Sequence, residues 1–236
     1  MPPTTNYLAI EAGRDVVAEL EVKRSRFLCF LRRVEDESEA RSLLAELRRS
    51  HHNARHHCSA FVVGPRRDLQ RSNDDGEPAG TAGMPMLQTL LGVDAPPNGG
   101  RAAEQPRDAP APIGPLSDVS AVVVRYFGGT LLGAGGLTRA YAASVSAALD
   151  QARFVHREYW PMRRVTLNHD VAGRLEHDLH GTGAVVRTTD YVIDGIQLTV
   201  AVPGGPDGLE RFDRWLAERQ LTAEDVGAEW IDVPLR

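Results

Sequence analysis

Hydrophobic and polar positions change their period several times along the first half of the chain. Residues 15–34 contain two alternating segments on either side of "KRSR", and this pattern predicts a hairpin of two strands. Residues 35–52 start with acidic side chains and end with basic ones, and Ala40, Leu43 and Leu47 lie between them at helical spacing. This charge order suits the helix dipole, so the segment is predicted to form a helix.

Further strands and helices are expected up to residue 152. Residues 56–64, "HHCSAFVVG", predict a strand, and residues 65–85 predict a long loop that leads into a short helix at "MPMLQTLLG". Residues 118–127, "DVSAVVVRYF", form a near-continuous apolar run, which is typical of a strand covered on both faces. A glycine-rich loop follows, and then apolar residues at helical spacing.

The segment 93–115 has a different composition from its surroundings. It is rich in Pro, Ala and Gly and contains almost no large apolar side chain. Such a segment cannot bury enough surface to fold by itself, so it is predicted to be a mobile surface insertion.

After residues 153–161 the pattern predicts six elements in the order βαββαβ, which is the ferredoxin-like arrangement. The strands are expected at 163–170, 184–193, 195–204 and 228–233, and the helices at 171–183 and 208–220. We therefore expect a two-domain α+β protein with domains at residues 1–158 and 159–236.

The composition narrows the class of protein. Hydrophobic residues make up 42% and charged residues 25%, as in ordinary globular proteins, and a formal net charge of −5 argues against a generally basic nucleic-acid binder. Four of the eight histidines lie between positions 51 and 57, so a local basic face is compatible with this net charge. No apolar run suggests a membrane span or a signal peptide, and two cysteines do not form a disulfide framework. A reduced, monomeric, cytoplasmic protein is expected.

The glycine-rich stretch "RYFGGTLLGAGGLTRAY" has two interpretations. A buried strand, a glycine loop and a helix can direct backbone N–H groups at an anion, with Arg125 and Arg139 adding charge. Alternatively, the glycines only supply positive φ angles and close strand–helix packing. The dinucleotide fingerprint is absent because Thr138 stands at the third glycine position, and no Walker Lys-Ser/Thr follows.

An acidic loop is the second candidate for chemistry. Asp74, Asp75 and Glu77 surround a glycine and are the kind of ligands that bind Mg²⁺. Alternatively, they form a turn in which aspartates bond backbone amides and Thr81 caps the next helix. The turn is the favoured interpretation, and we expect no metal and no cofactor.

The histidine cluster is the third candidate. His52 and His56 are four residues apart near Cys58, which suggests zinc, but the predicted change from helix to strand removes the shared face that such ligands need. A nucleophile pair of His56 and Cys58 on one strand face is an alternative. Simple burial of Cys58 is the favoured interpretation.

Four motifs, taken together, resemble the IMPACT/YigZ family. They are "KRSRF" (23–27), "ARHHCSA" (54–60), "NDDGEPAGTAG" (73–83) and "VVVRYFGGTLLGAGGLTRAY" (122–141), in the family's order. The C-terminal unit resembles the small domain of bacterial members, which is itself similar to a C-terminal domain of elongation factor G. The resemblance implies that the N-terminal domain has the α/β fold of the second domain of a small-subunit ribosomal protein.

The chain departs from the family pattern in two places. Ser59 stands where tyrosine is usual, and the segment 93–115 is longer than the usual link. The resemblance also implies a connection with translation. Eukaryotic members restrain activation of an initiation-factor kinase through an additional domain, and this mechanism is not carried over to the present chain.

We expect a translation-associated regulatory protein, non-catalytic or weakly catalytic, that binds RNA phosphate, the ribosome or a translation factor. The alternatives are an enzyme acting on a nucleotide or phosphorylated metabolite with Mg²⁺, and a protein-binding scaffold. The expected binding residues are Lys23, Arg26, Arg125, Tyr126, Gly128, Gly129, Gly133, Gly135, Gly136 and Arg139. The second cluster is His56, Cys58, Asp74, Asp75, Glu77 and Thr81.

Overall fold

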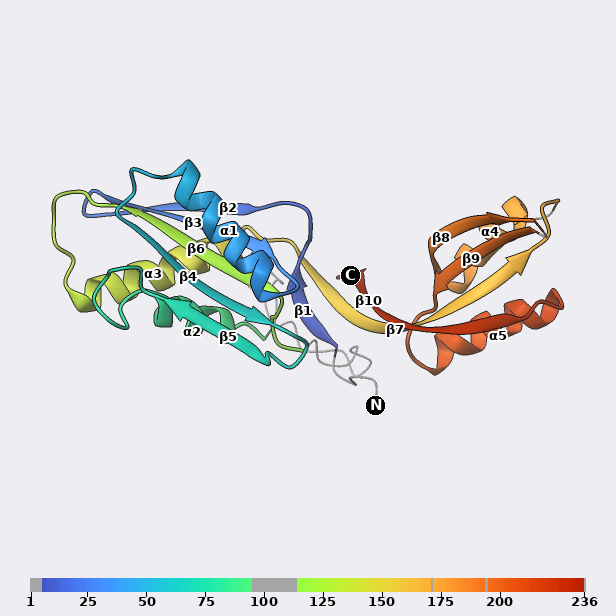
Figure 1. The fold of residues 1–236 in the computed structure, drawn as a ribbon. Coiled ribbons are helices and arrows are strands. Elements are labelled where there is room, and N and C mark those ends of the chain that lie inside the picture. The colour runs from blue at the N-terminus through green and yellow to red at the C-terminus, as the bar shows by residue number, and fades with distance from the viewer. Residues whose placement is uncertain (1–5, 95–113, 171, 194, 236) are drawn as a thin grey trace. The chain divides into compact units, whose positions relative to one another are not determined.

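The described residues of the chain form two compact units. The structure, a computed structural model, describes residues 6–94, 114–170, 172–193 and 195–235. The described parts of Thr5–His156 and Val233–Arg236 make up one unit, here called the N-terminal unit. Arg157–Asp232 make up the other, the C-terminal unit. Both contain strands and helices (Figure 1).

An antiparallel five-stranded sheet with the order β2-β3-β6-β4-β5 lies at the centre of the N-terminal unit (Figure 1). Its strands are β2 (Val16–Val22), β3 (Ser25–Arg33), β4 (His56–Val63), β5 (Leu69–Asn73) and β6 (Val119–Tyr126). The predicted hairpin over residues 15–34 is confirmed as β2 and β3, which pair up to Val22 and Ser25.

Helices cover both faces of this sheet, α1 (Glu37–Ser50) on one and α2 (Gly83–Leu91) with α3 (Ala134–Leu149) on the other (Figure 1). Successive residues of a strand point to opposite faces. Val122 and Val124 of β6 therefore pack with leucines of α1, whereas Val123 belongs to the core that α2 and α3 share. The apolar run of β6 is confirmed as a strand buried on both faces.

Two strands of the N-terminal unit were not predicted. β5 lies inside the predicted loop 65–85, where "LQRSN" shows no apolar alternation because this edge strand pairs only with β4. β1 (Tyr7–Ile10) is a four-residue strand whose residues are all buried, which is too short for a periodic signal.

The C-terminal unit has the element order βαββαβ. Its elements are β7 (Phe154–Leu167), α4 (Ala172–Leu179), the 3₁₀ turn η1 (His180–Thr182), β8 (Val185–Val192), β9 (Gly195–Ala201), α5 (Pro206–Glu218) and β10 (Ala223–Pro234). β9 pairs with β7 and β8, and β10 pairs with β7. Most of the segment 153–161, which the sequence pattern leaves between the domains, is the first half of β7.

Residues 95–113, and with them nearly all of the predicted insertion 93–115, lie outside the described residues. The described ends are adjacent, because the N–H of Leu116 donates to the carbonyl of Val93 at 3.0 Å. Among the described residues, none of the helices has the length and hydrophobicity of a membrane span.

Candidate functional site

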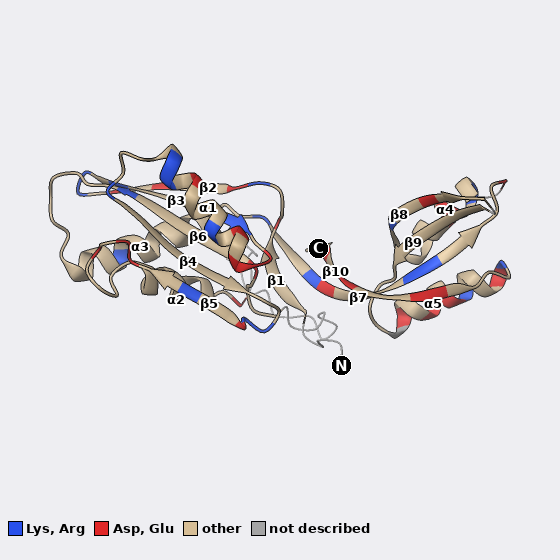
Figure 2. Cartoon of the chain, viewed as in Figure 1, with Lys and Arg blue, Asp and Glu red and all other residues tan. Residues whose placement is uncertain are grey.

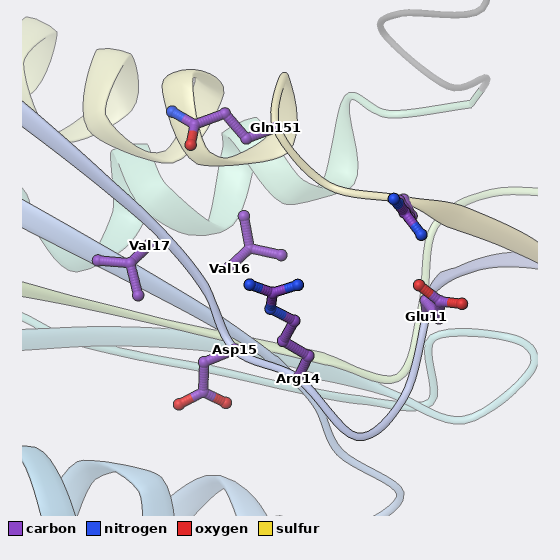
Figure 3. Close-up of a pocket in the computed structure, with 7 residues that line it drawn as sticks. Glu11, Arg14, Asp15, Val16, Val17 and Gln151 are labelled. Atoms are coloured by element: carbon purple, nitrogen blue, oxygen red, sulfur yellow. The ribbon is translucent and has the colours of Figure 1, made fainter.

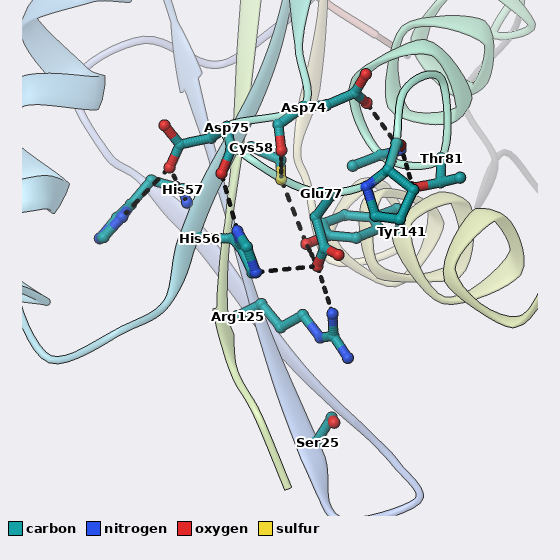
Figure 4. Close-up of polar contacts among 12 residues, drawn as sticks. Ser25, His56, His57, Cys58, Asp74, Asp75, Glu77, Thr81, Arg125 and Tyr141 are labelled. Carbon is teal, nitrogen blue, oxygen red and sulfur yellow. Dashed lines mark hydrogen bonds and ion pairs between the residues drawn. The ribbon is translucent and has the colours of Figure 1, made fainter. Parts of the chain in front are cut away.

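The candidate site forms where the first residue of β4, the end of β6 and the turn before α2 meet (Figure 4). The antiparallel register places His56 opposite Arg125. The turn brings Glu77 to the same place, where it contacts Arg125. The glycine-loop cluster and the acidic cluster, which the sequence presents separately, are therefore joined in one site.

A buried carboxylate lies at the centre of the site. Oε1 of Glu77 accepts hydrogen bonds from Nη1 of Arg125 at 2.5 Å and from the hydroxyl of Tyr141 at 2.8 Å. The side chains of Glu77 and Arg125 are only 4% and 6% exposed. A buried charge is costly unless it is paired, so each of these two side chains depends on the other.

His56 is held in one tautomer. Its Nδ1 lies 2.8 Å from the carbonyl oxygen of Asp75, and because a carbonyl only accepts, Nδ1 carries the proton. Nε2 lies 3.9 Å from Oε1 of Glu77 (Figure 4). The neutral ring therefore has its lone pair at Nε2, and protonation there would create an ion pair with Glu77.

Asp74 stabilises the start of α2. Its carboxylate accepts hydrogen bonds from the N–H groups of Gly80, Ala82 and Gly83. Burial alone would raise the pKa of Asp74, but these three donors outweigh it and lower the pKa below its usual value. The expectation that Thr81 caps this helix is wrong, because its hydroxyl donates to the carbonyl of Pro78.

Asp75 ties the turn to α1 and β4. Its carboxylate accepts from Nη2 of Arg48 at 2.6 Å and from the N–H of His57 at 2.7 Å. The carboxylates of Asp74, Asp75 and Glu77 thus all have protein donors, which compete with a cation. Within the described ranges, no group of three His, Cys, Asp or Glu side chains is placed to hold a metal ion. The arrangement matches the turn interpretation.

Cys58 points to the same face of β4 as His56, as strand alternation predicts. Its sulfur lies 3.0 Å from the carbonyl oxygen of Asp74 and 3.3 Å from the Tyr141 hydroxyl oxygen, and its single hydrogen can be donated to either of them. Burial raises the pKa of Cys58 to about 12 and raises the pKa of Tyr141 far above its usual value. A thiol held in this state is a poor nucleophile at neutral pH, so the geometry favours simple burial of Cys58.

The glycine loop packs on the hairpin between β2 and β3. A Cβ at Gly128 would lie 2.0 Å from the carbonyl carbon of Arg24, and the N–H of Gly128 donates to the Ser25 hydroxyl at 3.1 Å. Gly129 and Gly133 have φ angles of 84° and 71°, with nothing near the place of a side chain. The loop therefore requires glycine for packing at one position and for backbone conformation at two others.

A cavity of about 270 Å³ opens between this loop, the acidic turn and the start of α3. It is lined by Arg55, His56, Glu77, Pro78, Arg125, Phe127, Leu131, Leu132, Gly133, Ala134 and Leu137. Phe127 is 38% exposed and Leu131 is 83% exposed. The guanidinium of Arg55 lies 5.4 Å from the centre of the Phe127 ring. The cavity thus combines cationic groups with an accessible aromatic ring.

Comparison with known proteins places the chain in a family. Residues 23–96 and 114–149 match the Impact N-terminal domain. The IMPACT family member YvyE of Bacillus subtilis is 38% identical over 216 residues, which cover 92% of this chain and 87% of that protein. The chain belongs to the IMPACT family.

Other relatives agree with this assignment. The IMPACT family member YigZ of Escherichia coli is 36% identical over 172 residues, covering 72% of this chain and 71% of that protein. A crystal structure of a hypothetical protein is similar with a TM-score of 0.58 and 29% identity, covering 95% of this chain and 98% of the other.

The four IMPACT motifs contribute unequally to the cavity. His56, Glu77, Arg125 and Gly133 line it, whereas Asp74, Asp75, Cys58 and Thr81 support the turn beside it. The remaining expected residues do not line the cavity: Lys23, Arg26, Tyr126, Gly128, Gly129, Gly135, Gly136 and Arg139.

Arg26 and Tyr126 interact with each other and with other neighbours. Arg26 pairs with Glu19 at 2.6 Å and lies 5.7 Å from the centre of the Tyr126 ring, whose hydroxyl contacts His51. Lysine and arginine also lie on the hairpin turn, on the end of α1 and on α3 of this unit (Figure 2). Two of these cations are paired with carboxylates, Arg26 with Glu19 and Arg48 with Asp75.

Sequence reasoning missed Arg55, Phe127, Leu131 and Tyr141 as site residues. All four stand inside the motifs, Arg55 in residues 54–60 and the others in residues 122–141, and they carried no chemical pattern of their own. Their common signal appears only when the sheet register and the glycine loop bring them around Arg125.

A second cavity of about 380 Å³ lies elsewhere in the N-terminal unit (Figure 3). It is lined by Glu11, Arg14, Asp15, Val16, Val17, Gln151 and Arg153. The Asp15 carboxylate is already paired with Arg32 at 2.6 Å. None of the expected site residues lies there.

Proposed function

We propose that this chain is a translation-associated regulatory protein that binds RNA through the cavity beside its glycine loop. Membership of the IMPACT family supports the connection with translation. The observation that carries RNA binding is the combination of Arg55, Arg125 and the exposed Phe127 ring around one cavity. Cationic groups suit phosphate, and an exposed aromatic ring suits an unstacked base.

The start of α3 adds to this preference. Gly133 and Ala134 line the cavity, and no side chain caps the helix at Gly133. The first N–H groups of a helix have no partner within the helix, and its macrodipole favours an anion at this end. A phosphate at this end would therefore meet backbone donors as well as arginine.

The fold supports the proposal at a general level. The order βαββαβ with β10, β7, β9 and β8 as neighbours supports a ferredoxin-like C-terminal domain. We propose domain limits at residues 1–158 and 159–236, and a ribosomal-protein-like fold for the first domain. An enzymatic role with Mg²⁺ has less support, because Asp74 and Asp75 are engaged by protein donors.

Salt titration tests the proposal. Binding of a single-stranded RNA to the full chain, measured by fluorescence anisotropy, is expected to weaken steeply as salt rises, because phosphate contacts release counterions. The Arg55→Ala variant is expected to bind RNA more weakly and to show a shallower salt slope, since Arg55 is an exposed cation that lines the cavity. Salt-independent binding, or unchanged RNA binding by the Arg55→Ala variant, would count against the proposal.

A further inference from the structure

One edge of the Arg125 guanidinium has no acceptor. Nη1 bonds Glu77, and Nε is buried without a hydrogen-bond partner. Among the described residues Nη2 has no acceptor either, although it is not fully buried as Nε is. Arg125 as a whole is 5% exposed, so water has little access to Nε. Buried donors are almost always satisfied in folded proteins, and an unsatisfied one calls for an explanation such as a missing ligand.

The unsatisfied atoms form a recognisable donor pair. Nε and Nη2 lie on the same side of a guanidinium and can donate two parallel hydrogen bonds to one oxyanion. The same chain uses this edge in Arg32, whose Nε and Nη2 both donate to Asp15 at 2.6 Å. In Arg125 the rings of Phe27 and Phe127 lie 5.3 and 5.7 Å from Cζ, which fixes the guanidinium among apolar neighbours.

The cavity that Arg125 lines has two chemically different parts. Arg125, Arg55 and the uncapped start of α3 supply positive charge, whereas Phe127, Leu131 and Leu132 supply apolar surface. A volume of about 270 Å³ is at the lower end of small-ligand sites and does not hold several nucleotides. An anionic group joined to one flat apolar group matches both parts.

We propose that the cavity binds a single nucleotide by its phosphomonoester group, with phosphate oxygens on the Nε–Nη2 edge of Arg125 and the base against Phe127. This inference rests on the proposed function and narrows it to one end of an RNA chain. A free nucleoside monophosphate carries the same group. A phosphomonoester has more charge than a backbone phosphodiester. A terminal nucleotide also fits a cavity of about 270 Å³ more easily than the middle of a strand does.

Glu77 does not prevent this binding. Its charge is directed at Nη1 of Arg125 and shared with the Tyr141 hydroxyl, while the proposed phosphate lies on the opposite edge of the guanidinium. The contact with Glu77 therefore orients Arg125 and neutralises its charge. Arg55 and the start of α3 then provide the net positive charge of the cavity.

Binding experiments on the full chain compare four probes: AMP, adenosine, and one RNA oligonucleotide with either a 5′-phosphate or a 5′-hydroxyl. We expect the phosphorylated member of each pair to bind about tenfold more tightly or better, as charge-assisted hydrogen bonds do. Arg55→Ala, which removes an exposed charge at the cavity, is expected to reduce this preference. Arg66→Ala removes the same charge beyond the far end of β4, where its side chain is 77% exposed, and is expected to leave it unchanged.

Arg125→Lys retains the charge and loses the two-donor edge, so this variant is expected to lose the preference for the phosphorylated probes. The buried cysteines of the variant are expected to stay protected from thiol reagents, which shows that it is folded. Equal binding of 5′-phosphate and 5′-hydroxyl RNA would overturn the inference and leave the proposed RNA function standing. Binding of AMP without binding of either RNA would support the inference and overturn the proposed function. An equal loss of the preference for phosphorylated probes in Arg55→Ala and in Arg66→Ala would overturn the assignment of nucleotide binding to this cavity.

Discussion

Replacing Glu77 with alanine would leave the Arg125 guanidinium charged and unpaired inside the N-terminal unit. Both side chains are almost fully buried, at 4% and 6% exposure. Removing one partner of such a pair costs about 3–5 kcal/mol, because the remaining charge stays desolvated. The Tyr141 hydroxyl loses the same acceptor, so we expect Glu77→Ala at the upper end of this range.

Intrinsic probes separate the two units in this experiment. The three tryptophans, Trp160, Trp215 and Trp230, lie in the C-terminal unit, and the two buried cysteines, Cys29 and Cys58, lie in the N-terminal unit. Urea titration with thiol labelling should show a midpoint lowered by about 2.5 M in Glu77→Ala, for a typical slope near 2 kcal/mol per M. The tryptophan transition is expected to stay in place.

A double-mutant cycle tests the cause. Combining Glu77→Leu with Arg125→Met removes both charges, so the double variant should be more stable than the sum of the single losses predicts, by about 1–3 kcal/mol. Additive losses, or a Glu77→Ala variant whose cysteines stay as protected as before, would refute the view that the pair stabilises this unit.

Two further changes probe the loop and the turn. Gly128→Ala places a Cβ 2.0 Å from the carbonyl carbon of Arg24 and should lower the free energy of unfolding, measured by thiol labelling, by about 1–3 kcal/mol. The control Gly135→Ala has space for a Cβ and should lower it little. Equal stabilities of the two variants would contradict the close approach of Gly128 to the hairpin. Asp74→Ala removes the acceptor of three N–H groups and should cost about 0.5–2 kcal/mol at pH 7. The pKa of Asp74 is lowered in the folded state. Its contribution to the free energy of unfolding is therefore present above the unfolded pKa near 4 and is lost as pH falls through the folded pKa. The unfolding curves of the unmodified chain and of Asp74→Ala should converge toward acid pH. A difference that widens toward acid would contradict this assignment.

The sequence predicted those parts of the fold in which burial leaves a periodic pattern. β6 is an apolar run because both faces are covered, and α1 is recognisable from its leucines and its charge order. β5 escaped prediction because an edge strand needs only one partner and "LQRSN" is largely polar. Such a strand is set by its neighbour in space, and a local pattern does not contain that information.

The candidate site shows the same limit. The motifs indicated that Arg125 and Glu77 belong to important segments, but 48 positions separate them and nothing local shows that they pair. The glycines supported both an anion site and a packing role, and Gly128 is a close-packing position beside a cavity that has anion-binding features. The way the glycine loop packs on the hairpin determines the shape of the cavity. This packing is a property of the three-dimensional structure and leaves no local pattern in the sequence.

RNA bound in the cavity beside Phe127 can be detected by ultraviolet crosslinking in cells, followed by mass spectrometry of the RNA-linked peptides. We expect crosslinks in the peptide that contains Phe127, and we expect them to be lost in Arg55→Ala but not in Arg66→Ala. Recovery of protein partners without RNA, or RNA crosslinks confined to the C-terminal unit, would contradict binding of RNA in this cavity.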